Sequence, residues 1–160
     1  MKVYFLRHGL AGKRSEWKRD DAERPLTVEG IERMHRIAAT LAALDLGLDA
    51  IVTSPLVRAK QTAEIVAQEL EMPLKEDARL APGFNAELLR GVLLDHPGAK
   101  AVMVVGHEPD FSATIGALVG GGSIICRKGG LALVELPDAH SHKGELLWLV
   151  PPRILASGES

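Results

Sequence analysis

The sequence predicts an α/β fold, a three-layer α/β/α sandwich around a mostly parallel, mixed sheet. Short apolar runs typical of strands alternate along the chain with longer segments whose apolar residues recur every three or four positions, as in amphipathic helices. The run 101–105 is apolar without alternation, which is typical of a strand covered on both faces. Two later apolar runs, 131–136 and 145–150, have no helix between them, and we expect an antiparallel pair.

Length and composition narrow the class of protein. The chain has 160 residues, 46% hydrophobic and 25% charged, which suits a single folded domain over 1–160. A formal net charge of −2 argues against nucleic acid or an anionic membrane as a partner of the whole chain. One cysteine, Cys126, cannot form an internal disulfide and indicates a reducing compartment. The charged start is unlike a signal peptide, and we expect a cytoplasmic protein of unspecified oligomeric state.

The first half of the chain predicts two strand-and-helix units. In order, these are a strand at 3–6, a loop over 10–25, a helix capped by Thr27 and ended by Gly47, a strand at 50–53, and a helix from Ser54-Pro55 to Pro73. A hydroxyl at Thr27 can accept a free N–H of the first helical turn. Proline suits a first helical turn, so Ser54-Pro55 predicts a helix start. The loop 10–25 is long for so small a domain, and such loops are usually functional.

The second half predicts the remaining helices and strands. In order, these are an edge strand within 74–80, a turn at 81–83, a helix capped by Asn85 that runs through Leu94, the buried strand 101–105, a helix bearing Phe111, Ile115 and Leu118 that ends at 120–122, and the strands 131–136 and 145–150. Trp148 is predicted to lie in the core. The tail after Pro151-Pro152 is predicted to be frayed.

Two histidines and two arginines follow the ends of predicted parallel strands. Arg7 and His8 follow the first strand, Arg58 lies about one helical turn beyond the second, and His107 follows the long buried strand. Ligands of open α/β sheets bind beyond the carboxyl ends of the strands, so we expect these four side chains at one edge. Considered alone, Arg58 could be a solvated charge and His107 an ordinary histidine at a strand end. The prediction of all these residues at one edge of the sheet favours a functional site.

The chemistry of these four groups suits a phosphoryl group. Guanidinium groups offer planar pairs of donors to phosphate oxygens and stay charged at any working pH. Between such cations a neutral imidazole can attack phosphorus and form a covalent phosphohistidine. A second imidazole, when protonated, would stabilise charge on the transferring oxygens.

The same residues resemble motifs of the histidine phosphatase superfamily, which has the phosphoglycerate mutase-like fold. The matching segments, in order from residue 2 to about residue 110, are Leu6-Arg7-His8-Gly9, Arg24-Pro25-Leu26-Thr27 followed by Gly30, Ser54-Pro55-Leu56 with Arg58-Ala59 and Gln61-Thr62, and Val105-Gly106-His107-Glu108-Pro109. Small size and the Arg24-Pro25-Leu26-Thr27 segment make the chain most similar to the short bacterial branch, the phosphohistidine phosphatases of the SixA type.

This resemblance implies roles for individual residues. It implies that His8 is the nucleophile and that Arg7, Arg58 and His107 bind the phosphoryl oxygens, with no metal and no organic cofactor. Arg24 lies on a matching motif and is a further candidate for phosphate binding. A surface ion pair of Arg24 with Asp20 or Asp21 explains the residue equally well.

One departure from the family pattern bears on the substrate. Larger members carry a glutamate after the third strand as general acid, whereas this chain reads Leu-Ala-Pro-Gly-Phe-Asn over 80–85, and Leu10 stands where some short members carry an acid. Asp77 and Glu87, the nearest carboxylates, are expected to be solvated charges; Glu108 or a loop aspartate could serve instead. An alcohol leaving group needs protonation more than an imidazole does, so a missing acid favours phosphohistidine over a phosphate ester.

Three functions therefore stay open, in order of preference. The first is a phosphatase that acts on a phosphohistidine protein, with the charged loop from Lys13 to Arg24 as docking rim. The second is a small-molecule phosphomonoesterase of the same superfamily, or a mutase, for which the chain lacks the expected insertions. The third is a phosphate-binding module without catalysis, which would not need a nucleophilic imidazole. The pair His140 and His142 lacks a third ligand at metal-binding spacing.

Overall fold

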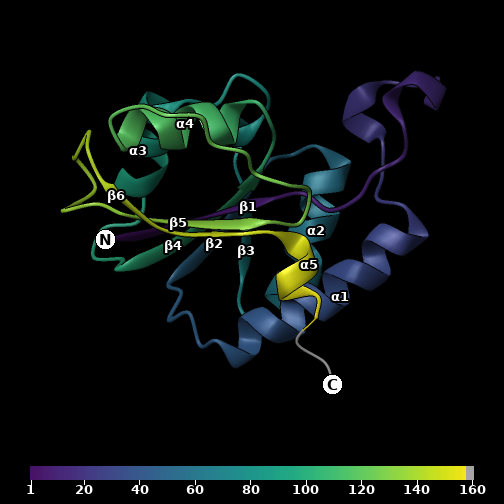
Figure 1. The fold of residues 1–160 in the computed structure, drawn as a ribbon, viewed down its shortest axis with the longest axis horizontal. Coiled ribbons are helices and arrows are strands. Elements are labelled where there is room, and N and C mark those ends of the chain that lie inside the picture. Colours follow the sequence, from purple (N-terminus) through teal and green to yellow (C-terminus); the bar gives the residue numbers. More distant parts are fainter. Residues whose placement is uncertain (158–160) are drawn as a thin grey trace.

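The structure is a computed structural model that describes residues 1–157, and it confirms the predicted α/β fold. One six-stranded sheet has the order β3-β2-β4-β1-β5-β6 (Figure 1). Its strands are β1 (Lys2–Arg7), β2 (Ala50–Thr53), β3 (Leu74–Glu76), β4 (Ala101–Gly106), β5 (Leu131–Glu135) and β6 (Glu145–Val150). The first four strands of that order pair in parallel, whereas β5 pairs antiparallel with both β1 and β6. The sheet is therefore mixed and mostly parallel, as predicted.

Helices cover both faces of the sheet. They are α1 (Val28–Ala43), α2 (Val57–Glu69), α3 (Ala86–Leu94), α4 (Asp110–Leu118) and α5 (Pro152–Leu155), with short 3-10 helices η1 (Arg14–Glu16), η2 (Asp21–Glu23) and η3 (Ala78–Leu80). Helices α1, α2 and α5 share one core with Tyr4 and Leu6, whereas α3 and α4 share the opposite core with Val3 and Phe5 (Figure 1). This alternation along β1 is the period of a strand with two buried faces.

Two predicted helix caps are confirmed. The Thr27 hydroxyl accepts the Gly30 N–H at 2.9 Å, and the Asn85 side chain accepts the Leu88 N–H at 3.0 Å. Each bond satisfies one donor of a first helical turn. Within residues 1–157, no helix has the length and apolar character needed to cross a membrane.

Two predicted helix bounds are wrong by about one turn. Helix α1 ends at Ala43 rather than near Gly47, because the chain turns through a positive φ of 46° at Asp45. Helix α2 begins at Val57 rather than at Ser54-Pro55. The Ser54 hydroxyl instead accepts the Leu56 N–H at 3.2 Å, so this segment forms a turn before the helix.

The predicted fraying after Pro151-Pro152 is wrong for the described part of the tail. Residues Pro152–Leu155 form α5, whose Leu155 is buried against α1 and whose Leu155 carbonyl accepts the Thr40 hydroxyl at 2.6 Å. Residues 158–160 lie outside the described residues. The prediction that Trp148 lies in the core is also wrong. Trp148 is 38% exposed on the edge strand β6, where its ring makes a T-shaped contact with Tyr4.

The segment 10–25 is a loop, as expected, with local order. It contains η1 and η2, and an isolated bridge between Ala11 and Leu26 closes its base. Most of its cations pair with carboxylates of the loop, including Lys13 with Glu16 at 3.8 Å and Arg19 with Glu23 at 3.0 Å.

Candidate active site

The strand register brings the two predicted histidines together. In the parallel pair of β1 with β4, Arg7 lies opposite Gly106, so His8 and His107 leave the sheet as neighbours. Their ring centroids lie 5.4 Å apart. Both side chains are buried, at 5% and 4% exposed, at the carboxyl edge of the parallel strands.

His8 is held as a neutral imidazole with one nitrogen free. Its Nδ1 lies 2.8 Å from the Gly9 carbonyl oxygen, and because a carbonyl oxygen only accepts, Nδ1 carries the proton. Nε2 of the neutral ring therefore keeps its lone pair. Burial, reinforced by the neighbouring His107, Arg58 and Arg7, lowers the pKa of His8 to about 3. The ring is thus neutral, with its single proton on Nδ1, over the whole neutral pH range.

His107 is the second neutral imidazole. Its Nε2 lies 2.7 Å from the Ser54 hydroxyl oxygen, while its Nδ1 is buried without a partner among the described residues. Burial, followed by the positive charge of Arg58, lowers the pKa of His107 to about 4. A dianion bound between these groups would raise that pKa, because an opposite charge favours the protonated ring.

Two guanidinium groups lie at the same edge with unpaired buried nitrogens. Arg7 donates from Nη1 to the Cys126 carbonyl at 2.9 Å, and Arg58 donates to the Asp21 carbonyl at 2.8 Å and to its carboxylate at 3.0 Å. In both arginines Nε is buried and has no hydrogen-bond partner in residues 1–157. Buried donors are nearly always paired, so unpaired donors on Arg7 and Arg58 are typical of a site for an anion.

Arg24 is joined to Arg58 through Asp21. Its Nε donates to the Asp21 carboxylate at 2.9 Å, and its Nη1 donates to the Gly12 carbonyl at 2.5 Å. The Asp21 carboxylate thus contacts both Arg24 and Arg58. The pair of Arg24 with Asp21 that the sequence offered is present, but it is not a surface pair, because Arg24 is buried at 8% exposed. A role of Arg24 in phosphate binding stays a prediction.

Thr62 and Gly9 connect the motifs of β1 and α2. The Thr62 hydroxyl accepts the Gly9 N–H at 3.0 Å and donates to the Arg58 carbonyl at 2.8 Å. Glycine is required next to His8, because a Cβ on Gly9 would lie 2.7 Å from Cγ of Met34. The backbone after His8 is therefore fixed against both α1 and α2.

Lys128 is a neighbour of the site that the sequence analysis missed. The Gly129 N–H bonds to the carbonyls of Arg7 and His8, at 3.1 and 3.0 Å, which fixes the preceding Lys128 beside them. Burial, followed by the positive charges of Arg7, Arg24 and Arg58, lowers the pKa of Lys128. The signal in the sequence was the Gly129-Gly130 pair before β5, where the chain makes this close approach.

The carboxylates considered as general acids are held in other contacts. Glu87 is exposed and pairs with Arg90, as expected for a solvated charge. Asp77 is not solvated, contrary to expectation: its side chain is 10% exposed, caps η3 and pairs with Arg79. Glu108 accepts the Ser112 hydroxyl at 2.8 Å. Among the described residues, no group of three or more His, Cys, Asp or Glu is arranged to hold a metal ion.

Comparison with known proteins defines the class. The family model described as "Histidine phosphatase superfamily (branch 1)" matches residues 3–82, and the chain belongs to this superfamily. It is similar to the phosphohistidine phosphatase SixA of Escherichia coli K12, with 30% identity over 113 residues, 68% of each chain. The solved structure of the protein histidine phosphatase SixA complexed with tungstate matches with a TM-score of 0.85 and 28% identity, covering 97% of this chain and 99% of that one.

An uncharacterised relative extends this comparison. A protein of Picosynechococcus sp. strain PCC 7002 is 43% identical over 117 residues, which are 69% of this chain and 68% of that protein. The resemblance inferred from the motifs is therefore confirmed at the level of family and fold, and the chain is a histidine phosphatase superfamily hydrolase of the SixA-like type.

Proposed function

We propose that the chain is a phosphatase that removes the phosphoryl group from phosphohistidine on a protein, through a covalent phosphohistidine at His8. One observation carries the proposal: His8 is a neutral ring whose Nδ1 proton is committed to the Gly9 carbonyl, so its Nε2 lone pair is free beside His107. An imidazole in this state is ready to act as a nucleophile without a separate base.

In the first step, Nε2 of His8 attacks phosphorus while the bond between phosphorus and the substrate imidazole breaks. The electron pair of that bond leaves on the substrate ring, which is neutral once its other nitrogen carries a proton. Nε of Arg7 and of Arg58 and Nδ1 of His107, the unpaired buried nitrogens, are the donors available to the phosphoryl oxygens. Their charge and direction stabilise the transferring group.

In the second step, water attacks the phosphorus of phospho-His8. The bond from phosphorus to Nε2 breaks, its electron pair returns to His8, and the two protons of the water leave with inorganic phosphate or pass to solvent. The proton of His8 stays on Nδ1 throughout, donated to the Gly9 carbonyl, so the phosphorylated ring is cationic and departs as a neutral imidazole. Both steps thus use a leaving group that needs no strong general acid.

Two observations support a phosphohistidine substrate over a phosphate ester. The carboxylates Asp77 and Glu87 pair with Arg79 and Arg90, and Glu108 accepts the Ser112 hydroxyl. The loop aspartate Asp21 contacts Arg58, but its pairing with Arg24 and Arg58 lowers its pKa and keeps it deprotonated, so it is a poor proton donor to an alcohol. SixA, to which the chain is similar, is described as a phosphohistidine phosphatase.

The phosphoenzyme tests this mechanism. The protein is incubated with labelled phosphoramidate and the reaction is quenched rapidly without acid. We expect this to trap a phosphoenzyme that is stable in alkali and labile in acid. His8→Ala should carry no label and lose turnover by about a thousandfold or more. His35→Ala, which removes an exposed histidine, is the matched control and should label as wild type does. Label on His8→Ala, or none on wild type, would contradict the proposal.

A substrate panel in EDTA separates the three functions. We expect higher kcat/KM for a phosphohistidine peptide than for an alkyl phosphate, with a chromogenic aryl phosphate also hydrolysed in the chelator because Arg7 and Arg58 supply the positive charge. Preference for the alkyl ester would favour a phosphomonoesterase. Tight binding of vanadate with no turnover would favour a phosphate-binding module.

A further inference from the structure

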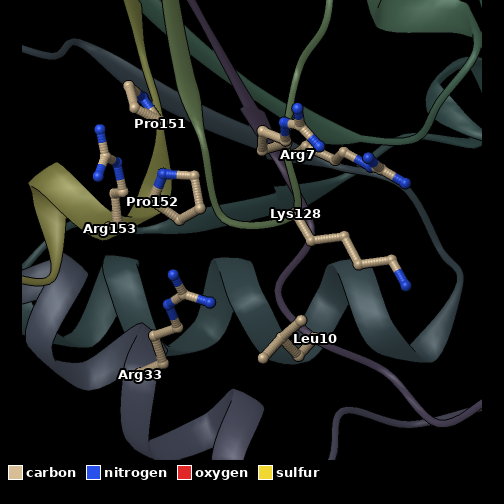
Figure 2. Close-up of a pocket in the computed structure, with 8 residues that line it drawn as sticks. Arg7, Leu10, Arg33, Lys128, Pro151, Pro152 and Arg153 are labelled. Carbon is tan, nitrogen blue, oxygen red and sulfur yellow. The ribbon is translucent and has the colours of Figure 1, made fainter.

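A basic cavity adjoins the candidate active site. It has a volume of about 640 Å³ and includes Arg7 in its wall, so it is continuous with the expected phosphoryl position. We call it the basic cavity and define it by the residues beyond Arg7 that carry the argument: Arg33, Arg127, Lys128, Pro151, Pro152 and Arg153. Figure 2 shows Arg33 rising from α1 towards Pro152, with Arg153 at the start of α5.

The cations of the basic cavity lack carboxylate partners. Within residues 1–157, no ion pair includes Arg33, Arg127, Lys128 or Arg153, and no acidic residue lines the cavity. The loop from Lys13 to Arg24, which the sequence suggested as the docking rim, is a weaker candidate, because its Lys13 and Arg19 are paired within the loop. A chain of net charge −2 thus concentrates uncompensated positive charge on one side of its site.

An apolar pocket continues the basic cavity along the sheet edge. It has a volume of about 230 Å³, shares Arg127 and Pro151 with the basic cavity, and is lined by Ile125 and Leu149. Ile125 is 61% exposed and Leu149 is 43% exposed. Exposed apolar side chains bordered by arginine have the composition of a protein interface rather than of a phosphate site.

We propose that the basic cavity and this apolar pocket together form the docking surface for the protein that carries the phosphohistidine. The partner presents carboxylates to Arg33 and Arg153 and an apolar side chain to Ile125 and Leu149. This inference rests on the proposed function and specifies it, because it states the chemistry that surrounds the phosphohistidine: an acidic face with an adjacent apolar residue.

The dimensions favour a protein face over a second phosphate on a small substrate. A cavity of this volume holds a ligand of many atoms, and it is lined by α1, the 126–130 loop and α5 rather than by one converging group of donors. An isolated phosphate would also make no use of the apolar pocket beside Arg127. Charge complementarity over both pockets would chiefly raise the association rate and select the partner.

The test compares two synthetic peptides, each phosphorylated by phosphoramidate at its single histidine. In one peptide the histidine is flanked by glutamates and a leucine, and in the other by glutamines and a glycine. We expect Arg33→Gln/Arg153→Gln to lower kcat/KM for the acidic peptide about tenfold, as two rim ion pairs would, and to leave the neutral peptide unchanged. Lys13→Gln/Arg19→Gln, with the same loss of charge on the loop, is the matched control and should change neither.

The remaining outcomes would contradict either the docking surface or the proposed function, and the two cases can be distinguished. Equal turnover of both peptides by wild type, or loss only in Lys13→Gln/Arg19→Gln, would overturn the docking surface and leave the phosphatase intact. A stronger effect of Arg33→Gln/Arg153→Gln on an alkyl bisphosphate than on the acidic peptide would overturn it in favour of a second phosphate. Absence of turnover with every peptide and with an aryl phosphate would instead contradict the proposed function itself.

Discussion

The protonation state of His8 depends on one backbone atom. Because the Gly9 carbonyl accepts from Nδ1 at 2.8 Å, the proton cannot move to Nε2 without losing that bond in a buried site. Burial keeps the same ring neutral by lowering its pKa to about 3. Nucleophilicity at Nε2 therefore follows from the local chain direction after β1 and not from a neighbouring side-chain base.

Asp21 offers a test of positioning at the residue scale. Its carboxylate contacts Nη2 of Arg58 and Nε of Arg24, so we expect it to hold the Arg58 guanidinium in place. Asp21→Ala should lower kcat/KM about tenfold, mostly through kcat, the size expected for one charge-assisted hydrogen bond. Steady-state kinetics with an aryl phosphate measure this effect.

The control lies in the same 3-10 helix. Glu23→Ala removes an exposed carboxylate that pairs with Arg19, and it should leave both kcat and KM as in wild type. If the Asp21 carboxylate instead competes with phosphate for Arg58, Asp21→Ala would bind vanadate more tightly and turn over faster, and the positioning role would be wrong.

Among the elements, α1 supports the site through a close contact at its first turn. Gly30 lies against the backbone after Gly9, and a Cβ at position 30 would stand 2.1 Å from the Leu10 carbonyl oxygen. That carbonyl also accepts the Thr27 N–H at 3.0 Å. The glycine therefore permits the N-terminus of α1 to pack directly on the segment that follows His8.

Two glycine-to-alanine variants distinguish the effect of the close contact with Leu10 from the general gain in helix propensity that alanine brings. Gly30→Ala should lower the free energy of unfolding by about 1–3 kcal/mol and reduce turnover, because Leu10 must move. A Cβ at Gly91 in α3 would meet only Nη1 of Arg79, at 3.1 Å, so Gly91→Ala should raise stability by up to about 1 kcal/mol. Chemical denaturation of both variants measures the difference; equal effects would show that the contact with Leu10 is unimportant.

For the whole molecule, the two buried histidines tie stability to pH. In the unfolded chain a histidine titrates near 6.5, whereas His8 and His107 in the fold titrate near 3 and 4. Below pH 6.5 the unfolded chain binds protons that the native state does not, so stability falls as pH falls towards those lower values. Each histidine contributes a slope of up to roughly 1.4 kcal/mol per pH unit.

The variant His8→Gln isolates one of these contributions. Between about pH 6.5 and pH 5, above the range in which most carboxylates titrate, we expect its free energy of unfolding to decline less steeply than that of wild type. Denaturant titrations at several pH values provide the comparison. Identical slopes for the two proteins would mean that His8 is not held neutral by burial.

Much of the fold and site could be predicted from local patterns along the chain. An apolar run without alternation predicted β4, and the capping residues Thr27 and Asn85 predicted the starts of α1 and α3. These features depend only on residues that are close together in the sequence. The position of His8 and His107 after parallel strands was enough to expect them together. Helix ends and the tail were less predictable, since α5 forms only where Leu155 can pack on α1.

The sequence alone determined the class of fold and, through its motifs, the family, and it predicted Arg7, His8, Arg58 and His107 as the site, because these signals lie within short segments. Only the tertiary structure decided which nitrogen of His8 is free, that Asp21 joins Arg24 to Arg58, and that the unpaired cations lie by α1, α5 and the loop before β5. The Asp21–Arg58 pair and the cluster of unpaired cations join groups far apart in the chain, and the hydrogen bond from His8 to the Gly9 carbonyl depends on the backbone direction that packing imposes after β1. Local sequence patterns carry no information about either until the sheet forms.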